Sequence, residues 1–283
     1  MKMFDNIAIA GLGLLGGSVA LAARKNNLVS EIFGYTRTPE TLEKAKNSGI
    51  VDRGFLCFSE MVKVADFLVL AAPISINIEL AKSIAKIKPN ILFTDVGSTK
   101  KSIADAVEKH FKRKHRFAGS HPMAGSEKRG IEQADGDLFK EKTVIITPVR
   151  NAEKNTVEKI DEFWRNTGAS TVTMDADQHD EICALTSHLP HLVAFLLVEM
   201  ISKEIHSSEV FACIGSGFRD TTRIAASDQE IWTDIFISNK HNILKSIKNF
   251  RTSLENVEKM IKAKDTDALK KWIGEIKEIR QRI

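Results

Sequence analysis

The chain has 283 residues, 43% hydrophobic and 28% charged, an ordinary balance for a soluble globular protein of about two domains. The formal net charge of +4 is mild, and the densest basic stretch, KHFKRKHR (109–116), is expected to be a solvated helix end, so nothing favours a nucleic-acid partner. Cys57, Cys183 and Cys213 lack CxxC spacing, which indicates reduced thiols and excludes a disulfide framework.

The chain also gives no signal for a membrane. The first residues, MKMFDNIAIAG, enter an apolar strand at once and leave no room for a signal peptide. The longest apolar run falls short of the roughly 18 residues that cross a bilayer, and Glu199 interrupts it. We therefore expect a cytoplasmic protein without a membrane partner.

Apolar strands alternate with helices through the first part of the chain. Strands are expected at 6–10, 31–37, 65–73, 90–97, 142–148 and 170–176. One intervening helix is capped by Thr38, has Pro39 at its first position and ends at Gly49. Because the strands are apolar on both faces, the pattern predicts an α/β fold, a doubly wound parallel sheet with helices on both sides.

The pattern changes after about residue 177. No further strand is expected, and long helical periodicity runs to the end of the chain. The sequence thus predicts two domains, a sheet domain at 1–176 and an all-α domain at 177–283. The apolar helices of the second domain are too numerous to bury in one monomer, so we expect a homodimer formed through it.

A glycine-rich turn follows the first strand. GLGLLG places Gly11, Gly13 and Gly16 in GxGxxG spacing, directly before a helix. The first glycine makes the tight turn, the second lets a pyrophosphate approach the backbone, and the third lets the helix pack on the sheet. This context predicts a Rossmann-type dinucleotide-binding domain.

The end of the second strand lacks an expected acid. An NAD-binding domain of this type usually has a carboxylate there for the ribose 2′-hydroxyl, whereas GYTRTPE has Thr36 and Arg37. An arginine beside hydroxyl groups suits a 2′-phosphate. The sequence therefore predicts NADP ahead of NAD, unless Arg37 is simply solvated.

Three segments are rich in polar residues that the fold alone does not require. DVGSTK (95–100) ends a strand at the edge where such sheets bind ligands, and GSHPMAGSE (119–127) is expected to be a loop that carries His121. The helical part contains TSHLPH (186–191) and GFRDTTRIAASDQEIW (217–232). Histidines and arginines joined to a cofactor domain predict a cleft for an anionic substrate.

Together these motifs resemble the prephenate/arogenate dehydrogenase family of tyrosine biosynthesis. GLGLLGGS, DVGSTK, GSHPMAGSE, SHLPH and GFRDTTRIA occur in the family's order and spacing over nearly the whole chain. No regulatory or chorismate mutase domain is recognisable, so the resemblance is to the compact, monofunctional form. It implies oxidative decarboxylation of prephenate to 4-hydroxyphenylpyruvate with hydride transfer to NAD(P)+, or the corresponding conversion of arogenate to tyrosine.

The resemblance also implies roles for individual residues. His121 would accept the proton of the substrate hydroxyl, and Ser98 would orient both groups. His191 would reach the substrate and Arg223 would pair with a carboxylate, with Arg219, His188 and Trp232 around them. Pro190 would bend the helix so that its start faces the cleft. The residues expected at the cofactor are Gly11, Gly13, Leu14, Leu15, Gly16, Thr36, Arg37, Pro73 and Ser98.

Several alternatives stay open. His188 and His191 are spaced for a metal, but no carboxylate or cysteine companion is evident, so no metal is expected. Arg219 and Trp232 could pack in an interface. A related β-hydroxyacid dehydrogenase would use a lysine where this chain offers histidines. A non-catalytic dinucleotide sensor would keep the glycine turn without needing Ser98, His121, His191 and Arg223 together.

Overall fold

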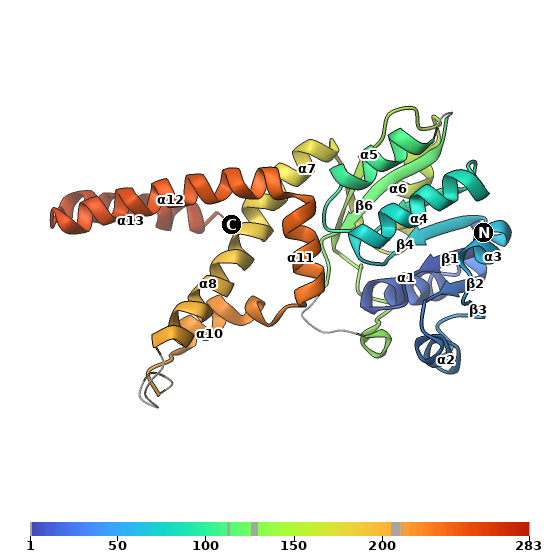
Figure 1. Cartoon of the computed structure of the whole chain (residues 1–283), viewed down its shortest axis with the longest axis horizontal. Helices are drawn as coiled ribbons and strands as arrows, with labels where there is room; N and C mark the ends of the chain where they lie inside the picture. The colour runs from blue at the N-terminus through green and yellow to red at the C-terminus, as the bar shows by residue number, and fades with distance from the viewer. Residues whose placement is uncertain (1, 112–113, 126–129, 205–209, 211, 283) are drawn as a thin grey trace. The chain divides into compact units, whose positions relative to one another are not determined.

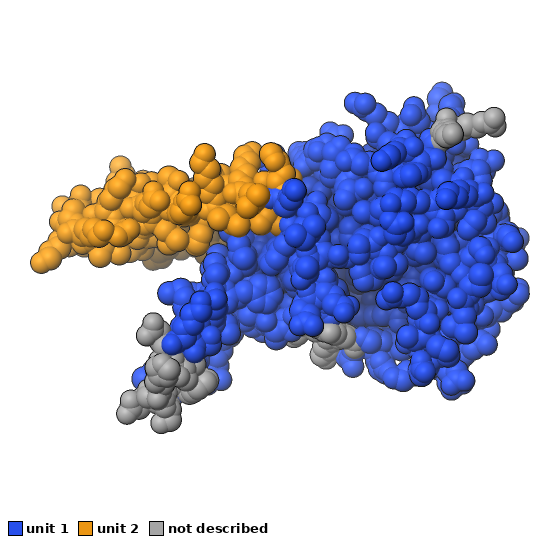
Figure 2. All heavy atoms as spheres, viewed as in Figure 1, with its two compact units in different colours: residues 1–240 blue, residues 241–283 orange. Residues whose placement is uncertain are grey.

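The computed structural model describes residues 2–111, 114–125, 130–204, 210 and 212–282, and the chain divides into two compact units, residues 1–240 and 241–283 (Figure 2). The strands are β1 Phe4–Ala10, β2 Val29–Tyr35, β3 Arg53–Phe55, β4 Phe67–Leu70, β5 Leu92–Asp95, β6 Arg116–Pro122, β7 Thr143–Pro148 and β8 Ser170–Thr173. The helices up to β8 are α1 Leu14–Lys25, α2 Pro39–Asn47, α3 Phe58–Val64, α4 Ile74–Ile87, α5 Lys101–His110, η1 Ile131–Gln133 and α6 Thr156–Asn166. The later helices are α7 Ala176–Cys183, η2 Ala184–His188, α8 Leu189–Glu204, α10 Ser216–Thr222, η3 Arg223–Ala226, α11 Gln229–Ser238, α12 Lys240–Lys262 and α13 Thr266–Arg280.

The strands form one sheet in the order β3-β2-β1-β4-β5-β6-β7-β8. β1 pairs in parallel with β2 on one side and with β4 on the other, so the strand order reverses there and a crevice opens beyond their carboxyl ends. The predicted doubly wound sheet is confirmed. It differs in one respect, because β6 and β7 run antiparallel.

Helices cover both faces of this sheet (Figure 1). On one face, α1 and α6 bury Val19, Ile160 and Trp164 against the strands. On the other, α3, α4 and α5 contribute residues such as Met61 and Ile84 to a second core. All five side chains are fully buried, and this burial is the main stabilising contribution to the sheet unit.

Two strands were not predicted, β3 and β6. The prediction that His121 lies on a loop is wrong, because His121 is the sixth residue of β6. Gly119 and Ser120 lower the local strand propensity, so this strand is stabilised by tertiary contacts. The buried Ser120 hydroxyl bonds with Thr94 Oγ1 at 2.7 Å and accepts from Trp164 Nε1 at 2.9 Å. The last two residues of the GSHPMAGSE motif, at 126 and 127, lie outside the described residues.

The helical run from α7 through α8 changes its winding in the middle. η2 is a π-helical segment that ends at His188, two residues before Pro190. Proline has no N–H to continue an α-helical ladder, and π-segments take up such interruptions. The structure thus places an irregular turn where the sequence predicted a bend.

By length and composition alone, residues Ala176–Lys203 would also suffice to cross a bilayer, which the sequence analysis did not expect. The core helix of a soluble protein passes the same test, so a single such helix is weak support for a membrane protein. Only 22% of its most apolar window is buried, and Leu196 and Met200 are exposed. This apolar surface is available for contact with another chain.

The second unit contains most of α12 and all of α13. Asp265 caps α13 by accepting from the N–H of Ala268 at 3.0 Å. No residue of α13 is buried, and Trp272, Ile273, Ile276 and Ile279 form an exposed apolar stripe at helical spacing. A helix of this kind is stabilised when its stripe packs against a partner.

Candidate active site

A pocket of about 360 Å³ opens beside the carboxyl ends of β5 and β6. Three residues predicted for the active site line it, namely Ser98, His121 and Trp232. The other lining residues are Pro122, Met123, Ala124, Gly125, Leu138, Lys142, Ser187 and Ile235. The parallel strands β5 and β6 end at the same edge of the sheet, and this register brings Ser98 and His121 to one cavity.

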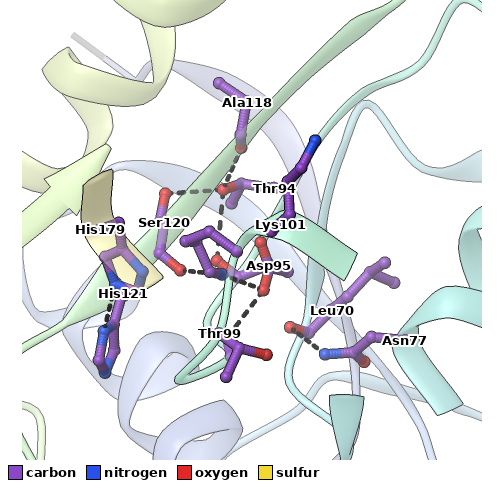
Figure 3. Close-up of polar contacts among 12 residues, drawn as sticks. Leu70, Asn77, Thr94, Asp95, Thr99, Lys101, Ala118, Ser120, His121 and His179 are labelled. Carbon is purple, nitrogen blue, oxygen red and sulfur yellow. Dashed lines mark hydrogen bonds and ion pairs between the residues drawn. The ribbon is translucent and has the colours of Figure 1, made fainter. Parts of the chain in front are cut away.

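The DVGSTK segment is held by a buried ion pair between Lys100 and Asp95, the second of which is labelled in Figure 3. Both residues are almost fully buried, and Lys100 Nζ also donates to the carbonyl of Ser120 at 2.7 Å. Asp95 Oδ2 accepts from the N–H of Gly97 at 2.8 Å. A buried charge without a partner would be costly, so the pair fixes the turn that carries Ser98.

His121 contacts a second histidine that the sequence analysis missed (Figure 3). His121 Nδ1 lies 2.8 Å from Nε2 of His179, and His179 Nδ1 lies 2.7 Å from Oδ1 of Asp180. His179 and Asp180 are buried, in the middle of α7. The three side chains form a continuous hydrogen-bonded line from the pocket into the protein interior.

The environment of His121 keeps its ring neutral. Burial is the largest cause and lowers the pKa of His121 well below its usual value, and unfavourable electrostatic interactions with His179, Lys100 and His188 lower it further. Cys183 Sγ lies 3.4 Å from His179 Nε2, and burial raises the pKa of this thiol to about 12. A neutral imidazole beside an uncharged thiol suits a group that accepts a proton at physiological pH.

His121, His179 and Cys183 could also supply metal ligands, since their three ligand atoms lie within 4.8 Å of one another. In the sequence, His188 and His191 are the pair spaced for this role, and no metal is expected. In the structure the two ligand nitrogens of His121 and His179 are occupied with each other. The absence of a metal remains a prediction.

Trp232 lines the pocket, whereas the other predicted substrate residues of the helical part, His188, His191, Arg219 and Arg223, are not among its lining residues. The ring of His191 stacks on Trp232 with centroids 3.7 Å apart, and Trp232 forms the pocket wall. Arg223 acts on His191 electrostatically, and its positive charge helps to lower the pKa of that imidazole, although burial is the larger cause. Arg219 lies exposed on α10.

His188 is buried, one turn before His191. Its Nδ1 lies 3.1 Å from the amide nitrogen of Asn239, which also donates to the carbonyl oxygen of Asp180 at 2.7 Å. Burial lowers the pKa of His188 to about 4. Asn239, at the end of α11, therefore joins that helix to α7 and to His188.

The glycine turn has the shape that a dinucleotide requires. A Cβ on Gly16 would stand 1.9 Å from the carbonyl oxygen of Gly11, and Gly11 itself has a φ of +103° with the backbone of Ala71 against it. At Gly13 a Cβ would meet nothing within 4 Å, so open space lies above the start of α1. These residues fit a bound pyrophosphate, with Leu14 and Leu15 in the first helical turn.

A second pocket, of about 560 Å³, includes two of the predicted cofactor residues, Arg37 and Pro73. Its remaining lining residues are Ser75, Ile76, Gln229, Glu230, Thr233 and Asp234. Ser75 donates from its N–H and its hydroxyl to Asp234 Oδ2, which joins α4 to α11. Thr36 is not in this lining, and its hydroxyl accepts from the N–H of Thr38.

The comparisons with known proteins agree with this geometry. The sequence model of the prephenate dehydrogenase nucleotide-binding domain matches residues 19–173, and that of the prephenate dehydrogenase dimerization domain matches residues 175–275. The chain belongs to the prephenate dehydrogenase family. The predicted family, the predicted fold class and the prediction of an oxidoreductase are thereby confirmed, whereas the domain boundary at residue 176 and the individual site roles remain predictions.

Relatives within and beside the family cover nearly all of the chain. Prephenate dehydrogenase of Lactococcus lactis is 36% identical over 97% of this chain and 76% of its own length. A prephenate dehydrogenase of A. aeolicus, solved with hydroxyphenyl propionate and NAD+, matches with a TM-score of 0.92 at 34% identity over 100% of this chain and 98% of its own. Synechocystis arogenate dehydrogenase matches with a TM-score of 0.82 at 26% identity, covering 98% and 99%.

The residues that sequence reasoning missed lie around His121. Lys100 belongs to the recognised DVGSTK motif, and a lysine directly before a helix at the ligand edge was the available signal. His179 and Asp180 are adjacent in DADQHDEIC, and a histidine followed by an acid in a helical segment was a weaker signal. Lys142, which lines the pocket, gave no signal that separates it from other surface lysines.

Proposed function

We propose that this protein catalyses the oxidative decarboxylation of prephenate to 4-hydroxyphenylpyruvate, with transfer of a hydride to NAD(P)+. The observation that carries the proposal is the neutral imidazole of His121 in a pocket shared with Ser98. Membership of the prephenate dehydrogenase family supports it, as does the likeness to the A. aeolicus enzyme with its bound hydroxyphenyl compound and NAD+.

The proton of the substrate hydroxyl goes to His121. As the carbinol carbon loses its hydride, its C–O bond becomes a carbonyl, and the imidazole takes the hydroxyl proton in the same step. The bound cofactor supplies the hydride acceptor. The bond to the ring carboxylate then breaks, its electron pair enters the ring as CO2 leaves, and the protonated His121 returns its proton to the phenolate oxygen. Ser98 would orient the hydroxyl towards the imidazole.

Cationic groups would bind the two carboxylates of prephenate. Arg223 is proposed for one, because a guanidinium can pair with a carboxylate through two parallel hydrogen bonds. Lys142 lines the pocket and offers a second positive charge. His191 and Trp232, stacked on each other, would form the wall against which the ring of the substrate packs.

Arogenate is the second candidate substrate. It differs from prephenate by an amino group in place of the side-chain ketone, so His121 could perform the same proton transfer. The likeness to Synechocystis arogenate dehydrogenase over 98% of this chain supports arogenate as a candidate substrate. The deciding experiment is a turnover assay that offers prephenate and arogenate, each with NAD+ and NADP+. Dinucleotide binding without turnover of either substrate would contradict the proposal and support a sensor.

We further propose that NADP is preferred to NAD. Thr36 stands where a carboxylate would grip the ribose 2′-hydroxyl, and Arg37 lines the second pocket together with Pro73. Arginine provides a charge-assisted partner for a 2′-phosphate, whereas the missing carboxylate removes a repulsion. The relative k_cat/K_M of the purified enzyme for the two cofactors tests this.

A cytoplasmic homodimer completes the proposal. The match to a dimerization domain supports it, as do the exposed apolar residues Leu196 and Met200 on α8 and Trp272 and Ile276 on α13. No nucleic-acid or membrane partner is included, in keeping with the mild net charge. Light scattering should give twice the chain mass of 31.5 kDa. A monomer at micromolar concentration would contradict the dimer.

A further inference from the structure

We propose that His179 and Asp180 are positioning residues that fix the tautomer of His121, so that its Nδ1 carries the proton and its Nε2 is left to accept one. The consequence for catalysis rests on the proposed function, since it assigns proton transfer to His121. The tautomer itself is a property of the free protein.

Asp180 is the fixed end of the line. Its Oδ1 accepts from the backbone N–H of Lys100 at 2.8 Å, and its Oδ2 accepts from that of Lys101 at 3.0 Å. These two groups lie at the start of α5, a ten-residue helix whose first N–H groups have no partner within the helix. With Asp180 only 1% exposed, the carboxylate is held as an acceptor and cannot turn away.

The protons along the line follow from that acceptor. A carboxylate offers no proton, so His179 Nδ1, at 2.7 Å from Asp180, must donate to it. When His179 is neutral, its Nε2 is unprotonated and can only accept. His121 Nδ1, at 2.8 Å from that nitrogen, must therefore carry a proton and donate it. The lone pair of His121 is left on Nε2, the nitrogen that would meet the substrate hydroxyl.

The neighbouring groups leave this assignment unchanged. The buried thiol of Cys183 contacts both rings, at 3.4 Å from His179 Nε2 and 3.9 Å from His121 Nδ1, but it stays uncharged because burial raises its pKa to about 12. The ammonium group of Lys100 is paired with Asp95 and with the carbonyl of Ser120. Neither group competes with Asp180 for the proton of His179.

This arrangement has a functional reason. A free imidazole in water exchanges between two tautomers, and only one of them presents an acceptor at Nε2. A base with its proton on the wrong nitrogen would donate to the substrate hydroxyl and could not accept from it. Fixing the tautomer in advance removes this unproductive state before the substrate binds.

The first test measures the tautomer directly. In the full-length protein labelled with ¹⁵N-histidine, long-range ¹H–¹⁵N correlation at pH 7.5 should show His121 as the Nδ1–H form, with the resonance assigned by its loss in His121→Asn. A wild-type His121 in the Nε2–H form would overturn the proposal. This measurement needs no substrate, so it tests the tautomer even if neither prephenate nor arogenate is turned over. Absence of turnover would contradict only the proposed function.

The second test uses a pair of variants at His179. In His179→Gln, Asp180 can hold the amide nitrogen, which leaves the amide oxygen to accept from His121. In His179→Leu no acceptor remains. We expect His179→Gln to keep the Nδ1–H form and k_cat within tenfold of wild type. His179→Leu should populate the Nε2–H form and lower k_cat at least fiftyfold, with the K_M for the cofactor within threefold in both. Equal k_cat and equal tautomer in the two folded variants would overturn the proposal.

The third test addresses Asp180 and packing. Asp180→Ala removes the fixed acceptor, so His121 should become a mixture of tautomers and k_cat should fall tenfold or more. Cys183→Ala contacts the same two rings but should change k_cat less than threefold and leave the tautomer as in wild type. If Asp180→Ala folds and keeps His121 wholly in the Nδ1–H form, Asp180 does not act as proposed. If it does not fold, the His179 pair still decides.

Discussion

His191 and Trp232 stack face to face, with ring centroids 3.7 Å apart and an angle of 24° between the planes. His191 Nδ1 lies 2.9 Å from the carbonyl oxygen of Ser187, one turn earlier, and donates to it. Trp232 belongs to α11 and lines the pocket, whereas His191 is not among the lining residues. Ser187 of the SHLPH motif lines the pocket itself, whereas His191 acts on the pocket through the indole of Trp232, which the sequence alone did not suggest.

The first prediction concerns this stack. Trp232→Leu should raise the K_M for prephenate about tenfold, because the pocket loses a flat wall and His191 loses its partner, whereas Trp232→Phe should keep most of the affinity. Steady-state kinetics at saturating cofactor measure both. Both variants should retain k_cat within about threefold, since neither touches His121. An unchanged K_M in Trp232→Leu would place the substrate elsewhere.

The second prediction concerns His121 itself. His121→Asn should lower k_cat by about a hundredfold or more, because the amide cannot take the hydroxyl proton, while the K_M for the cofactor stays nearly constant. Since the pKa of His121 is well below its usual value of about 6.5, the wild-type rate should stay level as the pH falls from 8 to 6.5 and decline only in more acid solution. Near-normal k_cat in the variant would remove His121 from the reaction.

The third prediction links His188 to stability. Its pKa of about 4 in the folded protein lies below the value of about 6.5 expected when unfolded, so below pH 6.5 the unfolded chain binds a proton that the folded one lacks. The stabilisation is fully present above pH 6.5 and is lost as the pH falls towards 4, where the loss reaches about 3 kcal/mol. His188→Asn keeps an acceptor for Asn239 but cannot titrate. Urea unfolding at several pH values should show a flatter decline in the variant, and parallel declines would contradict this.

Particular residues show which parts of the fold and of the site were predictable from the sequence. Gly11, Gly13 and Gly16 were predictable because a tight turn between a strand and a helix depends on local backbone geometry. The strand position of His121 was not, because β6 is stabilised by pairing with both neighbouring strands. The contact of His121 with His179 joins residues 58 positions apart and follows from the packing of α7, which no local pattern encodes.

The fourth prediction concerns Arg223. If its guanidinium pairs with a substrate carboxylate, Arg223→Ala should cost on the order of 2–4 kcal/mol in transition-state binding, mostly as a raised K_M. Arg223→Lys is the matched variant. It keeps the charge but loses the planar fork, so its K_M should lie between those of wild type and Arg223→Ala. Unchanged K_M and k_cat in Arg223→Ala would mean that the arginine does not contact the substrate.

The fifth prediction tests the cofactor preference by adding one carboxylate and removing another. Without a carboxylate at position 36 and with Arg37 lining the second pocket, a contact of about 1.5–3 kcal/mol with a 2′-phosphate corresponds to a tenfold to hundredfold higher k_cat/K_M for NADP+. Thr36→Asp restores the acid and should abolish or reverse the preference for NADP+. Glu230 lines the same pocket and repels a phosphate there, so Glu230→Gln should increase the ratio. A clear wild-type preference for NAD+, or a ratio that rises in Thr36→Asp and falls in Glu230→Gln, would show that Arg37 does not bind the 2′-phosphate.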